Sequence, residues 1–297
     1  MALDCLIAGE ANVDLLVESH GALQVGAEML AESMNLALGG SSAITAFNLA
    51  RLGAKVGFIS VVGQDLLGRF VEDRLSTAGI DLNGLRRSKQ ESTGLTIWIS
   101  SHKQRAGLTY PGTISSLRAK DVSATQLKNA RHLHVGHYFL LTKLHPEAPD
   151  LFARAKRLGL TTSLDCNYDP SEQWNSNIWK VLEHTDIFSP NEQEALRLTG
   201  EKNVEKASRR LSQLVPIVTV KLGARGVLVR SKEGSFRIPA LTVRVVDTAG
   251  AGDSFNAGFL SQYLRGASLT KCAAAGIKAA ARCVTGVGGT AAFERRP

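Results

Sequence analysis

The chain has 297 residues, of which 44% are hydrophobic and 21% are charged, and this composition is ordinary for a globular protein that can bury a sizeable core. No apolar run is long enough to span a bilayer, residues 3–9 are too short and too weakly basic for a signal peptide, and the four cysteines form no C-x-x-C pair, so we expect a cytoplasmic protein with no membrane partner. The net charge is +8, but the basic residues are dispersed in pairs such as Arg86-Arg87, which argues against nucleic acid as a partner.

Short apolar runs alternate along the chain with segments of helical periodicity, and this pattern predicts an α/β fold built on a mainly parallel sheet. Strands are predicted at 5–8, 56–59, 132–135, 160–164, 187–188 and 217–220, in a hairpin of 227–230 and 235–238, and in an apolar run that ends at Asp247. Helices are predicted over 65–78, 146–158, 174–184, 191–199, 204–214, 251–264 and 269–284, and from a cap at Ser41 or Ser42 to Gly53.

Two segments interrupt this rhythm. Residues 10–37 and 92–110 contain strand-like alternation with no helical segment between the strands, as in Thr-Ile-Trp-Ile-Ser at 96–100. We therefore expect these two segments to form a small sheet that is separate from the main one.

The most informative stretch is 246–259, which reads Val-Asp-Thr-Ala-Gly-Ala-Gly-Asp-Ser-Phe-Asn-Ala-Gly-Phe. Gly250 and Gly252 allow backbone N–H groups to approach a ligand, and the helix that starts there adds unpaired N–H groups and the positive end of its dipole. Such a combination favours a phosphate site. Asp253 stands at its edge and could accept a proton from an attacking hydroxyl, so the stretch indicates phosphoryl transfer to an alcohol.

Two other phosphate-binding fingerprints do not match this stretch. A Walker A loop carries lysine where Asp253 follows Gly252, and a dinucleotide fingerprint carries a small residue where Phe255 stands. From the spacing alone, a simple glycine turn in which Asp253 caps a helix remains the alternative.

Residues 247–253, Asp-Thr-Ala-Gly-Ala-Gly-Asp, resemble the C-terminal signature D-T-x-G-A-G-D of the ribokinase (PfkB) family of carbohydrate kinases. Further family motifs resemble 39–53 (the N-terminal signature), 63–68 (G-x-D-x-x-G), 190–194 (P-N-x-x-E) and 221–226 (K/T-x-G-x-x-G). The resemblance covers essentially the full length. It implies one ribokinase-like domain over 1–297, with three α/β/α layers, a mainly parallel central sheet, and a small β-sheet lid over the sugar from about 12–38 and 92–111.

The resemblance also implies how the phosphoryl group is handled. In this family the Gly-Ala-Gly backbone forms an anion hole and the final Asp is the catalytic base, roles that fall here on Gly250, Ala251, Gly252 and Asp253. ATP and Mg²⁺ are the cofactors that the family implies, and a positive net charge suits an anionic nucleotide.

Further family roles concern the metal ions and the nucleotide. Glu194 falls at a Mg²⁺ contact and Asn191 at a phosphate contact, although their spacing is also that of a capping box, and both interpretations can hold. A monovalent cation such as K⁺ is implied near Asp247 and the Ala249 carbonyl. The predicted nucleotide-binding residues are Asn191, Lys221, Gly223, Gly226, Thr248, Gly286 and Gly288. Simple turns and tight helix packing remain alternatives for these glycines.

The acceptor is expected at the carboxyl ends of the strands, because crevices open there in parallel sheets. Asn12 and Asp14 follow the first strand, Asp14 falls where the family's sugar-binding Asp lies, and Gly39 and Gly40 would let the backbone approach the sugar. Ile44 departs from the family, which often has a sugar-binding Asn at this position, and so it leaves the acceptor's identity open. Three more residues are predicted near this crevice, and they are His137, Asp165 and Asn167.

The sequence therefore predicts an ATP-dependent kinase that phosphorylates a hydroxyl, expected to be a hydroxymethyl group, of a small sugar or sugar derivative. A nucleoside kinase of the same family and a catalytically silent sugar- or nucleotide-binding regulator are the alternatives. The apolar strand at 97–99 could pair with a second subunit, which would give a homodimer through the lid. A zinc site at His132, His134 and His137 is disfavoured, because strand alternation places the third on the opposite face.

Overall fold

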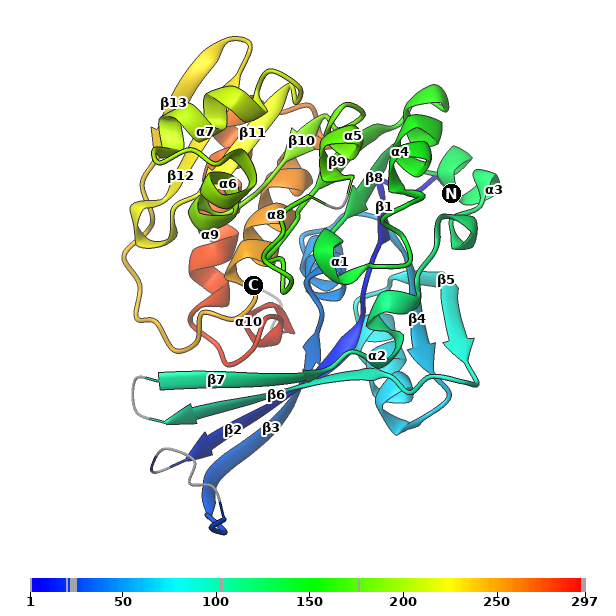
Figure 1. Cartoon of the computed structure of the whole chain (residues 1–297), viewed down its shortest axis with the longest axis vertical. Coiled ribbons are helices and arrows are strands. Elements are labelled where there is room, and N and C mark those ends of the chain that lie inside the picture. Colours follow the sequence, from blue (N-terminus) through cyan, green and yellow to red (C-terminus); the bar gives the residue numbers. More distant parts are fainter. Residues whose placement is uncertain (1, 20, 22–25, 102–103, 176, 295–297) are drawn as a thin grey trace.

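The computed structural model describes residues 2–294 except 20, 22–25, 102–103 and 176. Its larger sheet has nine strands in the order β13-β12-β11-β10-β9-β8-β1-β4-β5 (Figure 1). Neighbouring strands from β11 to β5 are parallel, whereas β12 and β13 add an antiparallel hairpin at one edge. The strands are β1 (Cys5–Ala8), β4 (Val56–Gly63), β5 (Asp81–Ser88), β8 (His132–Val135), β9 (Thr161–Leu164), β10 (Ile187–Phe188), β11 (Ile217–Lys221), β12 (Val227–Ser231) and β13 (Gly234–Ile238). The predicted mainly parallel sheet is confirmed, and β5 is a strand that the apolar pattern did not indicate.

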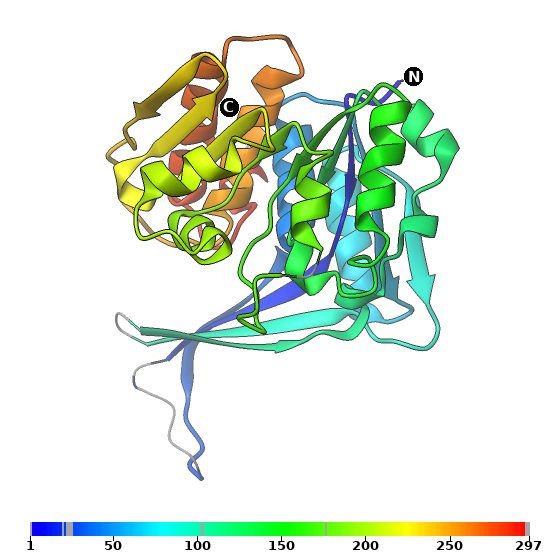
Figure 2. The same ribbon diagram turned by 45° about the horizontal axis from the view of Figure 1, so that its top comes forward.

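Helices cover both faces of this sheet (Figures 1 and 2). One face packs against α1 (Ser41–Arg51), α2 (Leu66–Thr77), α8 (Ala251–Tyr263) and α9 (Leu269–Cys283). The other face packs against α4 (Ala148–Arg157), α5 (Ile178–Leu182), α6 (Glu192–Thr199) and α7 (Val204–Leu211). All eight residues of β4 are buried, as expected for a strand covered on both sides. The three-layer prediction is confirmed.

Short helical segments complete the chain: η1 (Gly112–Ser116), η2 (Ala119–Asp121), α3 (Ala124–Lys128), η3 (Tyr138–Leu140), η4 (Gly223–Arg225) and α10 (Ala291–Glu294). Within the part of the chain that the structure describes, no helix has both the length and the apolar character needed to cross a membrane.

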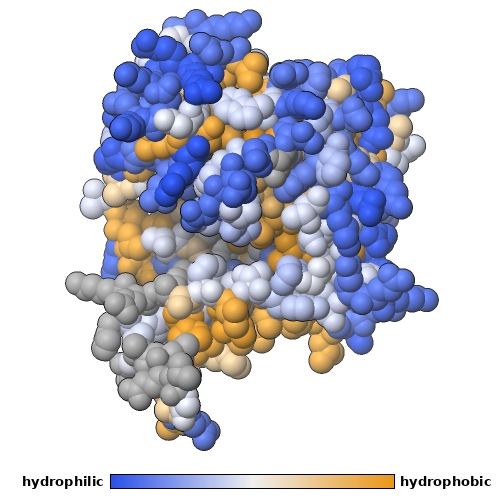
Figure 3. All heavy atoms as spheres, viewed as in Figure 1, coloured by the Kyte–Doolittle hydropathy of each residue, from blue (hydrophilic) through white to orange (hydrophobic). Residues whose placement is uncertain are grey.

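The second sheet has four strands in the order β3-β2-β6-β7 and extends away from the main body (Figure 1). It contains β2 (Asn12–Ser19), β3 (Ala31–Gly39), β6 (Gly94–Ser101) and β7 (Gln104–Tyr110). Its central pair, β2 and β6, is parallel, so the two predicted segments meet along their length. The predicted small separate sheet is therefore confirmed. Figure 3 shows hydrophobic surface at the level of this sheet.

Three local predictions were wrong. Residues 239–250 form no strand; the chain leaves the sheet after β13, and the N–H groups of Val246 and Asp247 donate to the Val284 carbonyl instead of to a neighbouring strand. Neither Ser41 nor Ser42 caps α1, because the capping position is Gly40 and no side chain bonds there. The helix predicted over 174–184 begins only at Ile178, since Trp174 and Asn177 have φ values of 54° and 59°, which an α-helix does not accept.

Candidate active site

The polar residues that follow the central strands gather at one edge of the larger sheet. Glu10 and Asn12 follow β1, His137 follows β8, Asp165 follows β9, and Lys221 ends β11. Because β1, β8, β9, β10 and β11 are parallel neighbours, their carboxyl ends open at the same edge. The amino end of α8 reaches this edge as well, as contacts of Asp253 and Gly252 show.

Gly250 begins α8 in a conformation that only glycine adopts readily. Its φ and ψ are 73° and 5°, and a Cβ there would lie 2.5 Å from the Gly289 Cα. A Cβ on Gly252 would approach the Lys221 Nζ to 3.3 Å. The glycine loop therefore places the amino end of α8 beside a lysine, and a helix amino end next to a positive charge is a suitable surface for phosphate.

Asp253 lies in the first turn of α8 and its carboxylate has a specific partner. The Ser41 hydroxyl, from the first turn of α1, donates to Asp253 Oδ1, and the Thr45 hydroxyl donates to the Asp253 backbone carbonyl at 3.4 Å. Burial raises the pKa of Asp253 to about 7; the Ser41 hydrogen bond opposes this shift and the negative charge of Asp165 adds to it. A carboxyl group with a pKa near neutrality is suited to take a proton from a hydroxyl.

Asp165 and Lys221 form a buried ion pair close to the glycine loop. Lys221 Nζ lies 2.5 Å from Asp165 Oδ2, and the two side chains are 13% and 0% exposed. Burial lowers the pKa of Lys221, but the charges of Asp165 and Glu194 outweigh it, so the net shift is upward and the ammonium stays charged. Asn256, one turn after Asp253 in α8, donates its Nδ2 to the same oxygen of Asp165 at 2.5 Å.

Glu194 makes the capping box that its spacing predicts. Its Oε2 accepts from the Asn191 backbone N–H at 2.8 Å, and Asn191 Oδ1 accepts from the Glu194 N–H at 2.9 Å. Burial, followed by repulsion from Asp165, raises the pKa of Glu194 to about 7. Its Oε2 also lies 3.8 Å from the Cys166 sulfur. An excess of buried negative charge therefore surrounds Asp165 and Glu194, which is the environment that a divalent cation relieves.

The predicted acceptor residues lie at the junction of the two sheets. Asn12 Nδ2 donates to Asp14 Oδ1 at 3.1 Å, and a Cβ on Gly39 would lie 2.3 Å from that Asp14 oxygen. Gly40, with φ 90°, turns the chain into α1. Ile44 is buried against the glycine loop, and a Cβ on Gly289 would meet its Cδ1 at 2.7 Å. The apolar side chain of Ile44 therefore forms part of the wall beside Gly250.

His137 and Asn167 follow β8 and β9 at this edge, and both have an unusual backbone conformation. Both have left-handed φ values of 51°. His137 Nδ1 lies 3.2 Å from Glu10 Oε1. Burial lowers the pKa of His137, but the hydrogen bond and charge of Glu10 outweigh it and the net shift is upward. The Asn167 N–H donates to Asp165 Oδ1 at 3.3 Å.

The predicted nucleotide residues divide into two groups. Asn191 and Lys221 belong to the cluster described above, and their elements are joined by an isolated bridge. Among the glycines, Gly226 has a packing role, because a Cβ there would collide with the Ile238 carbonyl at 1.9 Å. The exposed residues Gly223 and Thr248 take no part in that cluster.

The predicted monovalent-cation region has local bonds of its own. Asp247 accepts from the Ala249 N–H at 3.0 Å and from the Gly288 N–H at 2.9 Å, so it ties the start of the glycine loop to the C-terminal segment. Gly286 lies in the same segment, where a Cβ would approach Ala292 N to 3.2 Å.

Sequence reasoning missed three polar residues of this edge. Glu10 is buried and accepts from the Ser42 hydroxyl at 2.8 Å, Ser41 bonds to Asp253, and Asn256 bonds to Asp165. Each had a usable signal. Glu10 follows β1 almost directly, Ser41 follows the glycine pair, and Asn256 lies one helical turn after Asp253.

The histidines considered for zinc have other partners. His132 Nε2 and His134 Nδ1 each lie 2.7 Å from the Ser163 hydroxyl. His134 lines a small cavity of about 10 Å³ together with Ser163, Ser189 and Asn256, and its Nε2 has no hydrogen-bond partner among the described residues.

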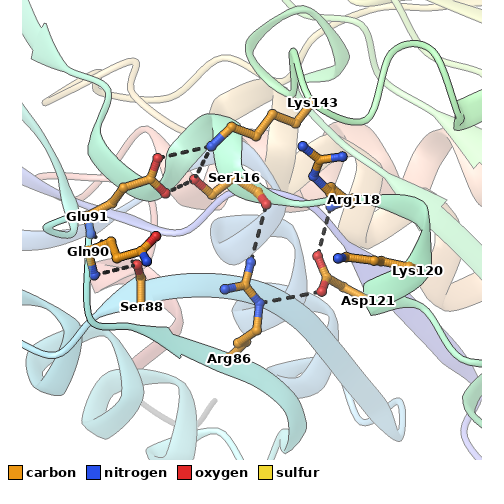
Figure 4. Close-up of a pocket in the computed structure, with 9 residues that line it drawn as sticks. All are labelled: Arg86, Ser88, Gln90, Glu91, Ser116, Arg118, Lys120, Asp121 and Lys143. Carbon is orange, nitrogen blue, oxygen red and sulfur yellow. Dashed lines mark hydrogen bonds and ion pairs between the residues drawn. The ribbon is translucent and has the colours of Figure 1, made fainter.

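A larger cavity lies apart from this edge, beside β5, η1 and η2 (Figure 4). Its volume is about 360 Å³, and its lining residues are Arg86, Ser88, Gln90, Glu91, Ser116, Arg118, Lys120, Asp121 and Lys143. Figure 4 shows Lys143 bonded to Glu91 and Ser116, and Arg86 bonded to Asp121. None of the predicted site residues lines this cavity, so its size does not identify it as the site of the chemistry.

Comparison with known proteins agrees with the geometry. A family model described as pfkB family carbohydrate kinase matches residues 2–296. The chain belongs to this family. It is thus an ATP-dependent carbohydrate kinase, a phosphotransferase with an alcohol group as acceptor.

Two relatives and one solved structure indicate the range of the family around this kinase. It is 30% identical to a ribokinase of Haemophilus influenzae over 98% of this chain and 95% of the relative. It is 31% identical to a 2-dehydro-3-deoxygluconokinase of Bacillus subtilis over 90% of this chain and 85% of the relative. A putative ribokinase II from E. coli, solved with ATP and Mg²⁺, superposes with a TM-score of 0.84 at 25% identity over 99% of this chain and 96% of that chain.

Proposed function

We propose that this kinase transfers the γ-phosphoryl group of ATP to a hydroxymethyl group of a small sugar or sugar derivative. The observation that carries the proposal is Asp253, whose carboxylate lies beside the glycine loop with a pKa of about 7. The carboxylate accepts the proton of the acceptor hydroxyl as the hydroxyl oxygen attacks phosphorus. The N–H groups of Gly250, Ala251 and Gly252 stabilise the charge on the transferring group.

The ion pair of Asp165 and Lys221 supports positioning of the nucleotide. Lys221 Nζ is close to the glycine loop and keeps its charge because Asp165 accompanies it, so it can attract phosphate oxygens. Asn191, Gly223, Gly226, Thr248, Gly286 and Gly288 complete the proposed nucleotide site. These groups act by orientation and electrostatics, which supply most of the acceleration in phosphoryl transfer.

Mg²⁺ fits the oxygen donors beside Glu194. Glu194 and Asp165 are buried carboxylates, and the raised pKa of Glu194 marks an unbalanced negative charge. When bound, Mg²⁺ neutralises charge on the phosphate oxygens. A monovalent cation near Asp247 and the Ala249 carbonyl is a further proposal, which a comparison of turnover in potassium and in a bulky organic cation would test.

The proposed acceptor site contains Asn12, Asp14, Gly39, Gly40, Ile44, His137, Asp165 and Asn167, with the small sheet as its lid. The relatives named for ribose and for 2-dehydro-3-deoxygluconate support a sugar or sugar acid. Ile44 offers no hydrogen bond, so the acceptor either lacks a hydroxyl at that point or contacts another residue. Apolar residues exposed on β3 and β7, including Met34 and Leu108, support a homodimer through this sheet, which sedimentation equilibrium would measure.

An ADP-release assay with ATP and Mg²⁺ tests the proposal against a panel of sugars, sugar acids and nucleosides. We expect one acceptor class to stimulate ADP release, and we expect Asp253→Asn to lower kcat by roughly 10²–10⁴ while ATP binding is retained. Asp150→Asn, a change at an exposed aspartate of α4, is the matched control. Near-normal turnover by Asp253→Asn would remove Asp253 from its role, and stimulation by nucleosides alone would favour a nucleoside kinase. ATP binding with no acceptor-dependent release would favour a silent regulator.

A further inference from the structure

Three different metal-ligating side chains meet beside the proposed phosphate site. One ligand atom from each of Asp165, Cys166 and Glu194 lies within 4.8 Å of the other two, and all three residues are buried. Asp165 and Cys166 directly follow β9, and Glu194 is fixed in the first turn of α6 by its capping box. Two of the donors therefore come from the end of β9 and the third from the first turn of α6.

The separation of the sulfur and the carboxylate suits a single ion. Cys166 Sγ lies 3.8 Å from Glu194 Oε2. A Zn–S bond of about 2.3 Å and a Zn–O bond of about 2.1 Å at a tetrahedral angle would place the two ligand atoms about 3.6 Å apart. A small side-chain adjustment would therefore bring both atoms onto one ion, with an oxygen of Asp165 as the third ligand.

The sulfur distinguishes this group from a site for Mg²⁺ alone. Mg²⁺ prefers oxygen ligands, whereas thiolate sulfur selects softer ions such as Zn²⁺. The nearby ammonium of Lys221, bonded to Asp165, does not prevent binding, because two carboxylates and a thiolate carry enough negative charge to balance both the ammonium and a dipositive ion.

We propose that Asp165, Cys166 and Glu194 form a binding site for Zn²⁺ and similar thiophilic cations, and that its occupation inhibits the kinase. On binding, the S–H bond of Cys166 breaks, a Zn–S bond forms, and the proton passes to the solvent. The ion would replace Lys221 as the partner of Asp165 and would compete with Mg²⁺ for Glu194. The inhibition rests on the proposed function of these residues, whereas the binding does not.

Cobalt binding tests the site without any assay of turnover. Co²⁺ is added to reduced, chelator-treated kinase and the near-ultraviolet spectrum is recorded. We expect a thiolate-to-cobalt charge-transfer band that added Zn²⁺ removes, that is absent in Cys166→Ala, and that is retained in Cys272→Ala. Cys272 is a matched control, because it is a buried thiol outside the Asp165–Cys166–Glu194 group. Cys166→Ser preserves the size of the side chain and replaces the alanine variant if that one does not fold.

The second measurement is ADP release at saturating Mg²⁺ over a range of buffered free Zn²⁺ concentrations. We expect half-inhibition of Cys166→Ser to require at least roughly tenfold more free Zn²⁺ than half-inhibition of the unmodified kinase, because even the loss of a group that only supports a metal ligand lowers metal affinity by about 10–100-fold. Absence of the charge-transfer band, the same band in Cys166→Ser, or equal Zn²⁺ sensitivity of the two proteins would overturn the proposal. A thiolate–cobalt band in a protein with no acceptor-dependent turnover would instead preserve the site and count against the proposed function.

Discussion

Two clusters of charged side chains in this kinase contain similar groups in different surroundings. The site cluster lies at the carboxyl ends of the central strands, and the cavity cluster lines the cavity in Figure 4. The site cluster consists of Asp165, Glu194, Lys221 and Asp253. The cavity cluster consists of Arg86, Glu91, Arg118, Lys120, Asp121 and Lys143.

Burial separates the behaviour of the two clusters. The side chains of the Lys221–Asp165 pair are 13% and 0% exposed, whereas those of the Lys143–Glu91 pair are 40% and 36% exposed. Burial raises the pKa of both Asp253 and Glu194 to about 7. In the cavity cluster, hydrogen bonds from Ser116 and Lys143 lower the pKa of Glu91. Burial thus gives the carboxyl groups of the site cluster pKa values suited to proton transfer and cation binding. Similar groups near water form ion pairs with lowered pKa values.

Removal of Lys221 should show the largest difference between the clusters. In Lys221→Met the carboxylate of Asp165 stays buried without its cation, so we expect the free energy of unfolding at pH 8 to fall by about 3 kcal/mol or more. Urea unfolding of the variant and of the unmodified kinase at pH 8 measures the loss.

The control for this prediction is Lys278→Met, at an exposed position of α9. Its effect on the free energy of unfolding should be within about 0.5 kcal/mol. The double variant Lys221→Met/Asp165→Asn should recover part of the stability, since no unpaired charge remains. Similar losses in Lys221→Met and Lys278→Met would show that the buried pair contributes nothing specific.

Local patterns predicted the layers and motifs well because they depend on neighbours in sequence. The buried parallel strands are short apolar runs, and the turn of Gly250 before α8 follows directly from its glycines. β5, which reads Asp-Leu-Asn-Gly-Leu-Arg-Arg-Ser, has no such run and belongs to the sheet only through its pairing with β4. The prediction of a strand before Asp247 was wrong for the opposite reason. Apolar and polar residues alternate there, but these residues pair with no strand of the described structure.

The site depends more on contacts between distant parts of the chain. The Ser41–Asp253 and Asn256–Asp165 bonds join residues 212 and 91 positions apart, and no local pattern specifies them. The local pattern favours Ser41 or Ser42 as a helix cap, whereas the Ser41 hydroxyl donates to Asp253 in another helix. The position of Cys166 beside Glu194 likewise depends on how β9 and α6 pack, so the mixed sulfur and oxygen donor set could be found only in the folded protein.

A single hydrogen bond, from Ser41 to Asp253, should shift the acid limb of the pH–rate profile. Asp253 acts as a base only when ionised, so kcat/KM should fall as the pH drops below about 7. Because the Ser41 hydrogen bond favours the ionised form, Ser41→Ala should move this limb to higher pH by roughly one pH unit. Thr45→Val is the matched control, since Thr45 bonds to the Asp253 backbone carbonyl and not to its carboxylate. An unchanged limb in Ser41→Ala would show that another group sets it.

The same pKa has a consequence for stability, with the opposite sign from that of an ordinary paired carboxylate. A folded-state pKa of about 7, above the ordinary 3.8, means that the folded protein binds the proton more tightly than the unfolded chain. The contribution of Asp253 is therefore full below pH 3.8 and is lost as the pH rises toward 7. Asp253→Asn should remove this part of the pH dependence, which urea unfolding between pH 5 and pH 8 would detect.

The smallest effect of a substitution on stability and turnover is expected in the cavity cluster. Lys143→Gln breaks the 3.0 Å pair with Glu91, but both side chains remain near water, so we expect the free energy of unfolding to fall by less than about 1 kcal/mol and kcat to be unchanged. Added salt should reduce even this difference, because the pair is open to screening, whereas the loss in Lys221→Met should persist. A loss in Lys143→Gln as large as that in Lys221→Met, and equally insensitive to salt, would mean that burial does not distinguish the two clusters.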